Sequence, residues 1–138
     1  MRLFLSGAIG ALALAACATA EPAVTDAGTS DASTNLVILY SLKEGVSPED
    51  FEDWVTSTDY PTMRGLERVE SFKTHRATSL LPGTGEGAPG VQYIETFAIS
   101  DLDGFIANDM GGETVQSIMG QFMGFAEAPQ FIVVEEIE

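Results

Sequence analysis

The amino-acid sequence predicts a single α+β domain with the element order β-α-β-β-α-β. Two patterns support this order: short runs of strand-forming residues, and two segments between them whose apolar residues recur at helical spacing. A third observation is length, because about a hundred residues follow a polar N-terminal segment, and that is enough for one small core.

The first strand and the first helix have clear sequence signals. LVILYS (36–41) is a short apolar run rich in strand formers. SPED (47–50) is typical of a helix start, with a serine cap, proline in the first helical position and acids in the first turn. We expect this helix to end or kink near Tyr60 and Pro61. One face of it carries Phe51, Trp54 and Val55.

A hairpin and a second helix follow. Residues 66–79 and 91–100 are predicted strands, and the glycine-rich segment 81–90 is a long loop between them. Ser100 or Asp101 caps a short helical turn that is interrupted around Gly111 and Gly112. The last strand is predicted at 131–137. The second helix is predicted from apolar residues that recur at helical spacing: Val115, Ile118, Met119, Phe122 and Met123.

This element order is that of the ferredoxin-like fold, a four-stranded antiparallel sheet with both helices on one face. The first and last strands are apolar on both of their sides, whereas a half-solvated sheet should alternate. Because the helices cover only one face, we expect a second copy to cover the other, giving a homodimer and a dimeric α/β barrel. The alternative is that these strands are apolar merely because they are central or short.

The N-terminus predicts export and a lipid anchor. One basic residue precedes an apolar run that is too short to span a bilayer, so residues 1–16 are interpreted as a signal peptide. LAAC (14–17) resembles the bacterial lipobox, and this resemblance implies cleavage before Cys17 and lipidation of that cysteine. The alternative is an ordinary signal peptide cut near residues 18–20. Residues 17–35 are predicted to be the lipidated cysteine and a flexible linker, and residues 36–138 the folded domain.

The predicted anchor and the net charge restrict the expected location and the expected partners. The anchor implies a membrane-bound lipoprotein facing the periplasm, and Ala18 after the cysteine favours the outer membrane over the inner one. The formal net charge of -15 opposes binding to nucleic acid and to anionic lipid headgroups, so the lipid anchor is the one membrane contact expected. A lipidated Cys17 would leave no thiol for disulfides or catalysis.

Five stretches together resemble the REDY-like (HapK-like) family of the dimeric α/β-barrel superfamily. They are LYSLKEGVSPEDFEDW (39–54), DYPTMRGLERVESF (59–72), HRATSLL (75–81), YIE (93–95) and ETVQSIMGQFMGFAEAPQFIVVEEI (113–137). The resemblance implies a link to prodiginine-type pigment biosynthesis. More distant relatives include cofactor-independent monooxygenases, polyketide cyclases and haem-binding proteins. An exported protein would not meet the cytoplasmic, carrier-bound intermediates of pigment assembly, so that role is not carried over.

His75 and Glu95 form the first candidate site. His75 is the only histidine, and if Ser79 pairs with Val91, it lies opposite Glu95 in the hairpin. Such a pair is a candidate catalytic base or proton shuttle. The alternative is a structural cross-strand pair, and a slip of one residue would send Glu95 to the opposite face.

A second group of candidates would bind a ligand. Asp59, Tyr60 and Arg64 follow the first helix, where Arg64 could hold a carboxylate or phenolate on which Tyr60 stacks. The alternative is a turn that Asp59 and Arg64 close around Pro61. Tyr93 would line the same wall as Glu95, and Trp54 is either core or a ligand wall.

Metals and cofactors are not expected. One histidine without a free cysteine gives no zinc spacing, and GTGEGAPG (83–90) lacks the lysine of a phosphate loop. The leading interpretation is a protein that binds a small apolar or aromatic molecule between its helices and its sheet. The alternatives are a cofactor-independent monooxygenase or cyclase with His75 as base, and a structural component of the envelope.

Overall fold

A computed structural model describes residues 33–138. The strands are β1 (Leu36–Leu42), β2 (Val69–Arg76), β3 (Tyr93–Ile99) and β4 (Ala126–Val133), and they form one antiparallel sheet in the order β2-β3-β1-β4. The helical elements, with η for a π-helical turn, are α1 (Pro48–Trp54), η1 (Val55–Asp59), α2 (Tyr60–Met63), α3 (Leu102–Gly104), η2 (Phe105–Asp109) and α4 (Glu113–Phe125). The predicted ferredoxin-like fold is confirmed.

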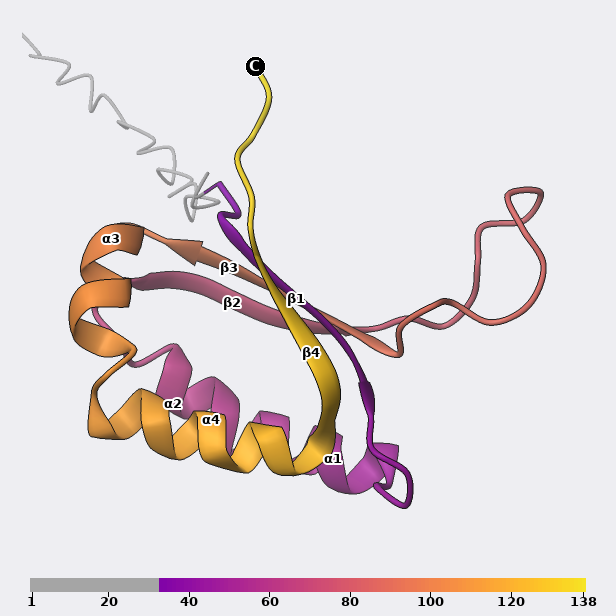
Figure 1. Cartoon of the computed structure of the whole chain (residues 1–138), viewed down its shortest axis with the longest axis horizontal. Coiled ribbons are helices and arrows are strands. Elements are labelled where there is room, and N and C mark those ends of the chain that lie inside the picture. Colours follow the sequence, from indigo (N-terminus) through magenta and orange to yellow (C-terminus); the bar gives the residue numbers. More distant parts are fainter. Residues whose placement is uncertain (1–32) are drawn as a thin grey trace, which may run out of the picture.

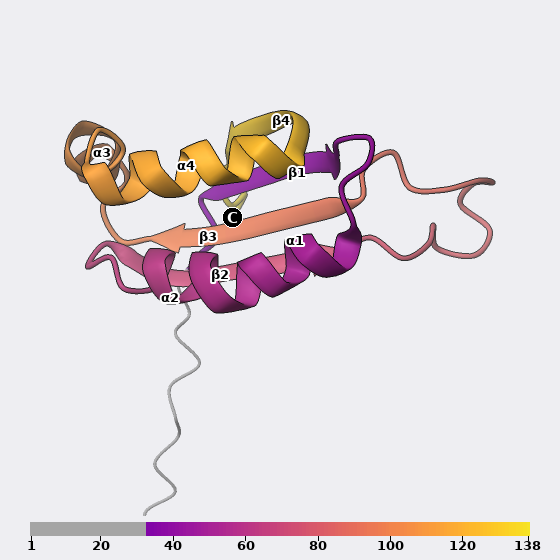
Figure 2. The ribbon, with the colours of Figure 1, turned by 90° about the horizontal axis from the view of Figure 1, so that it is seen from below.

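The α1–α2 rod and α4 form one layer on one face of the sheet. In Figures 1 and 2, the rod formed by α1, η1 and α2 runs along β2 and β3, and α4 lies beside it on the side of β1 and β4. The loop between β2 and β3 projects away from the body (Figure 1). Within residues 33–138, no helix combines the length and the apolar character needed to cross a membrane.

The sequence predicts an end or a kink of the first helix near Tyr60 and Pro61, and the structure has an irregular turn just before these residues, not an end. Ser47 caps the N-terminus as expected, and the rod continues to Met63. Its middle turn widens instead: the Tyr60 backbone N–H donates to the Val55 carbonyl, five residues back. A proline ring collides with the carbonyl of the preceding turn in a regular helix, and this wider turn places Pro61 in the first turn of α2.

The last strand begins and ends earlier than predicted. It starts at Ala126 directly after α4, whereas the sequence pattern favoured 131–137. The first half of the strand was not predicted because it contains Pro129, and proline donates no hydrogen bond within a sheet. It is tolerated here because β4 is an edge strand. A shift in the register with β1 between Leu39 and Ser41 absorbs the irregularity.

The core lies between the sheet and the helices. Tyr40, Phe51 and Phe72 are the largest fully buried side chains, and each comes from a different element. The residues that alternate with Tyr40 along β1, Val37 and Leu39, point to the opposite face and are only half-buried.

This opposite face is apolar at its centre and polar along the β2 edge. On β3, Ile94 and Thr96 are half-buried, whereas Lys73 and His75 on edge strand β2 are exposed. Across β1, Ile132 pairs with Val37 and is 37% exposed. No helix among residues 33–138 covers this face (Figure 1).

Candidate functional site

An apolar cavity lies between α4, η2 and the sheet. Its volume is about 260 Å³, and all twelve lining residues are apolar. Met110 and Val133 are at least 36% exposed, so they mark the mouth on the β4 side. The walls are formed by Leu36, Ile38, Met63, Phe97, Leu102, Phe105, Ile106, Met110, Val115, Met119, Phe131 and Val133.

A smaller cavity of about 40 Å³ adjoins it and is the inner end of the site. The two share six lining residues: Ile38, Met63, Phe97, Val115, Met119 and Phe131. Two carboxyl groups, those of Asp59 and Glu95, complete the inner cavity. Each residue is only 3% exposed. We call the two cavities together the inner site.

Glu95 is held by β3 with its side chain toward the helices. The Tyr40 hydroxyl, from neighbouring strand β1, donates to its Oε1 at 2.6 Å. Burial raises the pKa of Glu95 to about 8, and the Asp59 carboxyl adds to the rise, while the hydrogen bond from Tyr40 opposes it. Burial also raises the pKa of Tyr40, so this hydroxyl remains a donor.

Asp59 is the last residue of the widened turn η1. Among the described residues, its carboxyl group makes no hydrogen bond or ion pair within normal distances, although it is buried. Burial raises the pKa of Asp59 to about 7, and the positive charge of Arg64 limits the rise. Among residues 33–138, Thr74 Oγ1 is the one fully buried side-chain oxygen or nitrogen without a partner, so the unpaired Asp59 oxygens retain access to the inner cavity.

The predicted pair of His75 and Glu95 is wrong. His75 pairs with Ile94, and Glu95 pairs with Thr74. This is a register slip of one residue from the predicted pairing, so His75 is exposed on the face away from the helices. His75 therefore contributes nothing to the inner site.

Tyr60 and Tyr93 line a different pocket. This open pocket of about 280 Å³ also contains Glu52, Thr74 and Arg76. Its charges are already satisfied, because Arg76 pairs with Glu52 and the Tyr93 hydroxyl donates to Glu52 Oε1 at 2.7 Å. Burial raises the pKa of Tyr93 to about 12.

Two further predicted ligand residues have structural roles. The Trp54 indole N–H donates to Gln121 Oε1 at 2.9 Å, which ties α1 to α4. Arg64 donates twice to the Phe72 carbonyl, at 3.0 and 2.8 Å, and its guanidinium lies 3.6 Å from the Tyr60 ring centre. Of the predicted ligand-binding residues, only Asp59 reaches the inner site.

Tyr40 and the apolar walls were not identified from the sequence as site residues. The alternation of LVILYS puts Tyr40 on the same side as Ile38, and a hydroxyl on the helix-covered side must find a partner. The sequence therefore indicated that the Tyr40 hydroxyl needs a hydrogen-bond partner. The identity of the partner was not indicated, because it depends on the pairing of β1 with β3.

Comparison with known proteins identifies the family of this chain and other proteins of similar fold. Residues 34–137 match the family described as REDY-like protein HapK.

The chain belongs to this family.

HapK from Hahella chejuensis is 27% identical, with a TM-score of 0.59 over 75% of this chain and 92% of HapK. The Arabidopsis thaliana protein At3g17210 is 18% identical, with a TM-score of 0.61 over 77% of this chain and 97% of that protein. A dimeric ferredoxin-like protein of unknown function from Thermobifida fusca is 12% identical, with a TM-score of 0.54 over 72% and 86% of the two chains. The last two show likeness of fold alone. No curated protein matches the chain.

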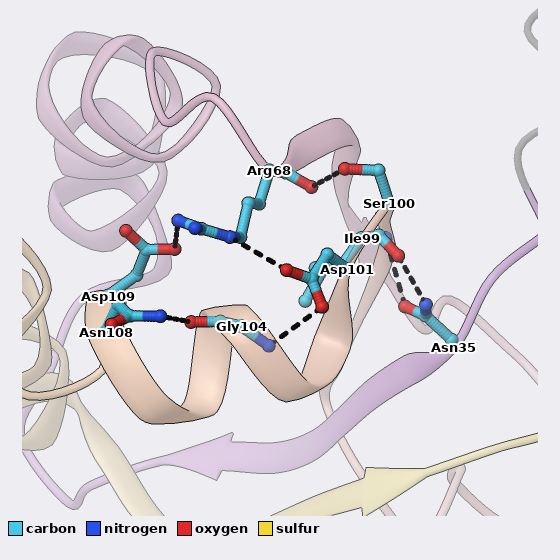
Figure 3. A network of polar contacts seen from close by, with 8 residues as sticks. All are labelled: Asn35, Arg68, Ile99, Ser100, Asp101, Gly104, Asn108 and Asp109. Carbon is cyan, nitrogen blue, oxygen red and sulfur yellow. Dashed lines mark hydrogen bonds and ion pairs between the residues drawn. The ribbon is translucent and has the colours of Figure 1, made fainter.

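In this REDY-like protein, one wall of the inner site is fixed by Arg68. Its guanidinium contacts Asp101 at 3.3 Å and Asp109 at 2.9 Å, and so spans both ends of the α3–η2 segment (Figure 3). Asp101 also accepts a hydrogen bond from the Gly104 backbone N–H at 2.9 Å, which caps α3. This clamp holds Phe105 and Ile106 of η2 against the cavity.

The same REDY-like domain begins just before β1. Asn35, placed in the predicted linker, donates from its side chain to the Ile99 carbonyl at 2.7 Å and accepts from the Ile99 N–H at 3.0 Å. The predicted signal peptide, Cys17 and most of the predicted linker lie outside the described residues. Among residues 33–138, no group of three or more His, Cys, Asp or Glu side chains could hold a metal ion.

Proposed function

We propose that this protein binds a small apolar or aromatic molecule in the inner site. The observation that carries the proposal is the cavity of about 260 Å³ with twelve apolar lining residues. Ligand sites are typically concave, mostly apolar and equipped with a few polar groups that fix orientation. Asp59 and Glu95 are those polar groups here.

The test uses the unacylated full chain (Cys17→Ser) and the neutral probe 1-methylnaphthalene. We expect the probe to shift the NMR methyl signals of Met63, Met110 and Met119, which line the cavity. Ile106→Trp should weaken binding by filling the mouth, since Ile106 is 50% exposed there. Leu81→Trp, on the distant loop, and His75→Ala should not change it. Methyl shifts that are absent, or equal in all these variants, would refute the proposal.

A second candidate is an enzyme of proton transfer, favoured by one observation. Two carboxyl groups with pKa values of about 7 and about 8 lie together at the end of an apolar cavity, and groups that titrate near neutrality suit acid–base catalysis. A monooxygenase or cyclase would therefore use Asp59 and Glu95 in place of His75. Deuterium exchange into 2-tetralone, followed by NMR, tests this: Asp59→Asn should abolish exchange while His75→Ala retains it. Equal rates with and without protein would reject catalysis.

Two copies are proposed to associate through the apolar face of the sheet. Val37, Leu39 and Ile94 are half-buried there, with no helix of the described residues above them. The dimeric ferredoxin-like protein from Thermobifida fusca supports this arrangement by its fold.

Export and anchoring are also proposed, on the sequence of residues 1–17. LAAC (14–17), after an apolar run, supports lipidation of Cys17 and a periplasmic location, with the outer membrane favoured. Labelled palmitate should enter the natural chain and be absent from Cys17→Ala. Equal label in both chains would reject this anchor.

A further inference from the structure

The polar end of the inner site consists of two carboxyl groups. Asp59 and Glu95 are its two polar lining residues, and each is 3% exposed. Glu95 has one hydrogen-bond donor, the Tyr40 hydroxyl, and Asp59 has none among the described residues. Unpartnered carboxyl oxygens at the end of a cavity are positioned to accept hydrogen bonds from a guest molecule.

No basic side chain offsets these carboxyl groups inside the cavity. Arg64 is the nearest cation that influences Asp59, but its guanidinium is committed to the Phe72 carbonyl and to the face of Tyr60. The helix α4 and strand β4 contribute only apolar side chains to the inner cavity. An anionic ligand would therefore meet repulsion, and a cation would be attracted.

We propose that the ligand carries a protonated nitrogen at one end of an apolar body, and that this nitrogen binds the carboxyl groups of Asp59 and Glu95. The inference rests on the proposed function and adds the chemical class of the ligand, an apolar or aromatic amine. The inner cavity of about 40 Å³ accommodates one small head group, since a water molecule occupies about 30 Å³ in the liquid. The larger cavity of about 260 Å³ receives the body.

The effect of a bound cation on the two carboxyl groups gives a second way to recognise an amine ligand. Three groups act on the pair from the surrounding elements: the hydroxyls of Tyr40 on β1 and Thr74 on β2 lower the pKa of Glu95, and Arg64 after α2 lowers that of Asp59, while the Asp59 carboxyl raises the pKa of Glu95. Both carboxyl groups have raised pKa values in the free protein. A bound cation favours their ionised forms, so binding of an amine should release protons near neutral pH.

The experiment compares three probes of matched shape by calorimetry with the unacylated full chain at pH 7. The probes are 1-naphthylmethylamine, 1-methylnaphthalene and 1-naphthylacetic acid. We expect the amine to bind at least about tenfold more tightly than the neutral probe, a difference of about 1.4 kcal/mol, and the acid more weakly than both. The heat for the amine should depend on the ionisation enthalpy of the buffer, and the heat for 1-methylnaphthalene should not.

Variants separate this inference from the proposed function. Asp59→Asn should bring the affinity for the amine close to that for 1-methylnaphthalene, and Glu95→Gln, which keeps an acceptor for Tyr40, should reduce the same ratio. Glu52→Gln is the matched control, because Glu52 pairs with Arg76 outside the inner site. Equal binding of the amine and the neutral probe would overturn the amine assignment and leave the proposed function intact. Failure of all three probes to bind would overturn both.

Discussion

The Tyr40 hydroxyl donates a hydrogen bond of 2.6 Å to Glu95 Oε1 between neighbouring strands β1 and β3. Both residues lie under the helices, where Tyr40 is 1% exposed and Glu95 3%. The pair fixes the direction of the Glu95 side chain, which lines the inner cavity. The inner site is therefore a consequence of how these two strands pair.

Removing the Tyr40 hydroxyl should destabilise the fold and raise the pKa of Glu95. Tyr40→Phe is expected to lower the free energy of unfolding by about 1–3 kcal/mol, because a buried carboxyl loses its donor. The pKa of Glu95 should rise further, since the hydrogen bond from Tyr40 lowers it. Urea unfolding and the carbon-13 carboxyl signal of Glu95 measure the two effects. Tyr93→Phe is the control, and a pKa of Glu95 unchanged in Tyr40→Phe would contradict the role given to this contact.

The buried carboxyl groups should make the protein less stable as the pH rises. In the unfolded chain, Asp and Glu titrate near ~3.9 and ~4.3, whereas in the folded chain Asp59 and Glu95 have pKa values of about 7 and about 8. The folded state therefore holds more protons between these limits. Their contribution to stability is complete below about pH 4 and is lost progressively up to about pH 8.

Glu95→Gln isolates this effect. Its free energy of unfolding should exceed that of the natural chain increasingly from pH 5 to pH 9. Glu52→Gln should run parallel to the natural chain over this range, because the pKa of Glu52 is lowered chiefly by its hydrogen bond from Arg76, and that stabilisation is lost only as the pH falls below about 4. Denaturant titrations at several pH values give both curves. Parallel curves for Glu95→Gln and the natural chain would show that Glu95 is not buried as an acid.

Two glycine substitutions should have opposite effects. Alanine at a helical glycine normally stabilises by about 1 kcal/mol, and Gly120→Ala in α4 should do so because nothing lies within 4 Å of the added carbon. At Gly104 the same carbon would overlap the Asp101 carboxylate and approach Arg68 Nε. Gly104→Ala should therefore open the Arg68 clamp, lower the melting temperature and speed amide exchange in residues 102–110. A melting temperature raised by both substitutions would refute the clamp.

A charge on the uncovered sheet face should separate the proposed dimer. Leu39→Lys places an ammonium group at the centre of that face, where an apolar partner surface could not solvate it. Light scattering at micromolar concentration should give twice the monomer mass for the natural chain and the monomer mass for Leu39→Lys. Leu81→Lys, on the exposed loop, should remain a dimer. A monomeric natural chain would reject the interface.

The sequence alone determined the order of the elements, because local signals specify each one. The cap at Ser47, the apolar period of α4 and the alternation of β1 are properties of neighbouring residues. Asp59 was identified as a candidate for the same reason: it falls at the predicted end of the first helix, which is visible in the sequence. The family resemblance rests on the same local stretches and is confirmed over residues 34–137.

Only the tertiary structure decided which groups meet. The loop between β2 and β3 is too long to fix their register, and the observed pairing of Thr74 with Glu95 turns Glu95 to the helices and His75 away from them. Local rules predicted an end or a kink of the helix near Tyr60 and Pro61, and they did not specify the widened turn that carries Asp59. In a strand, successive side chains point to opposite faces, so one residue of register moves a carboxyl group from one side of the sheet to the other. That choice depends on packing across the whole core and is not recorded in any local pattern.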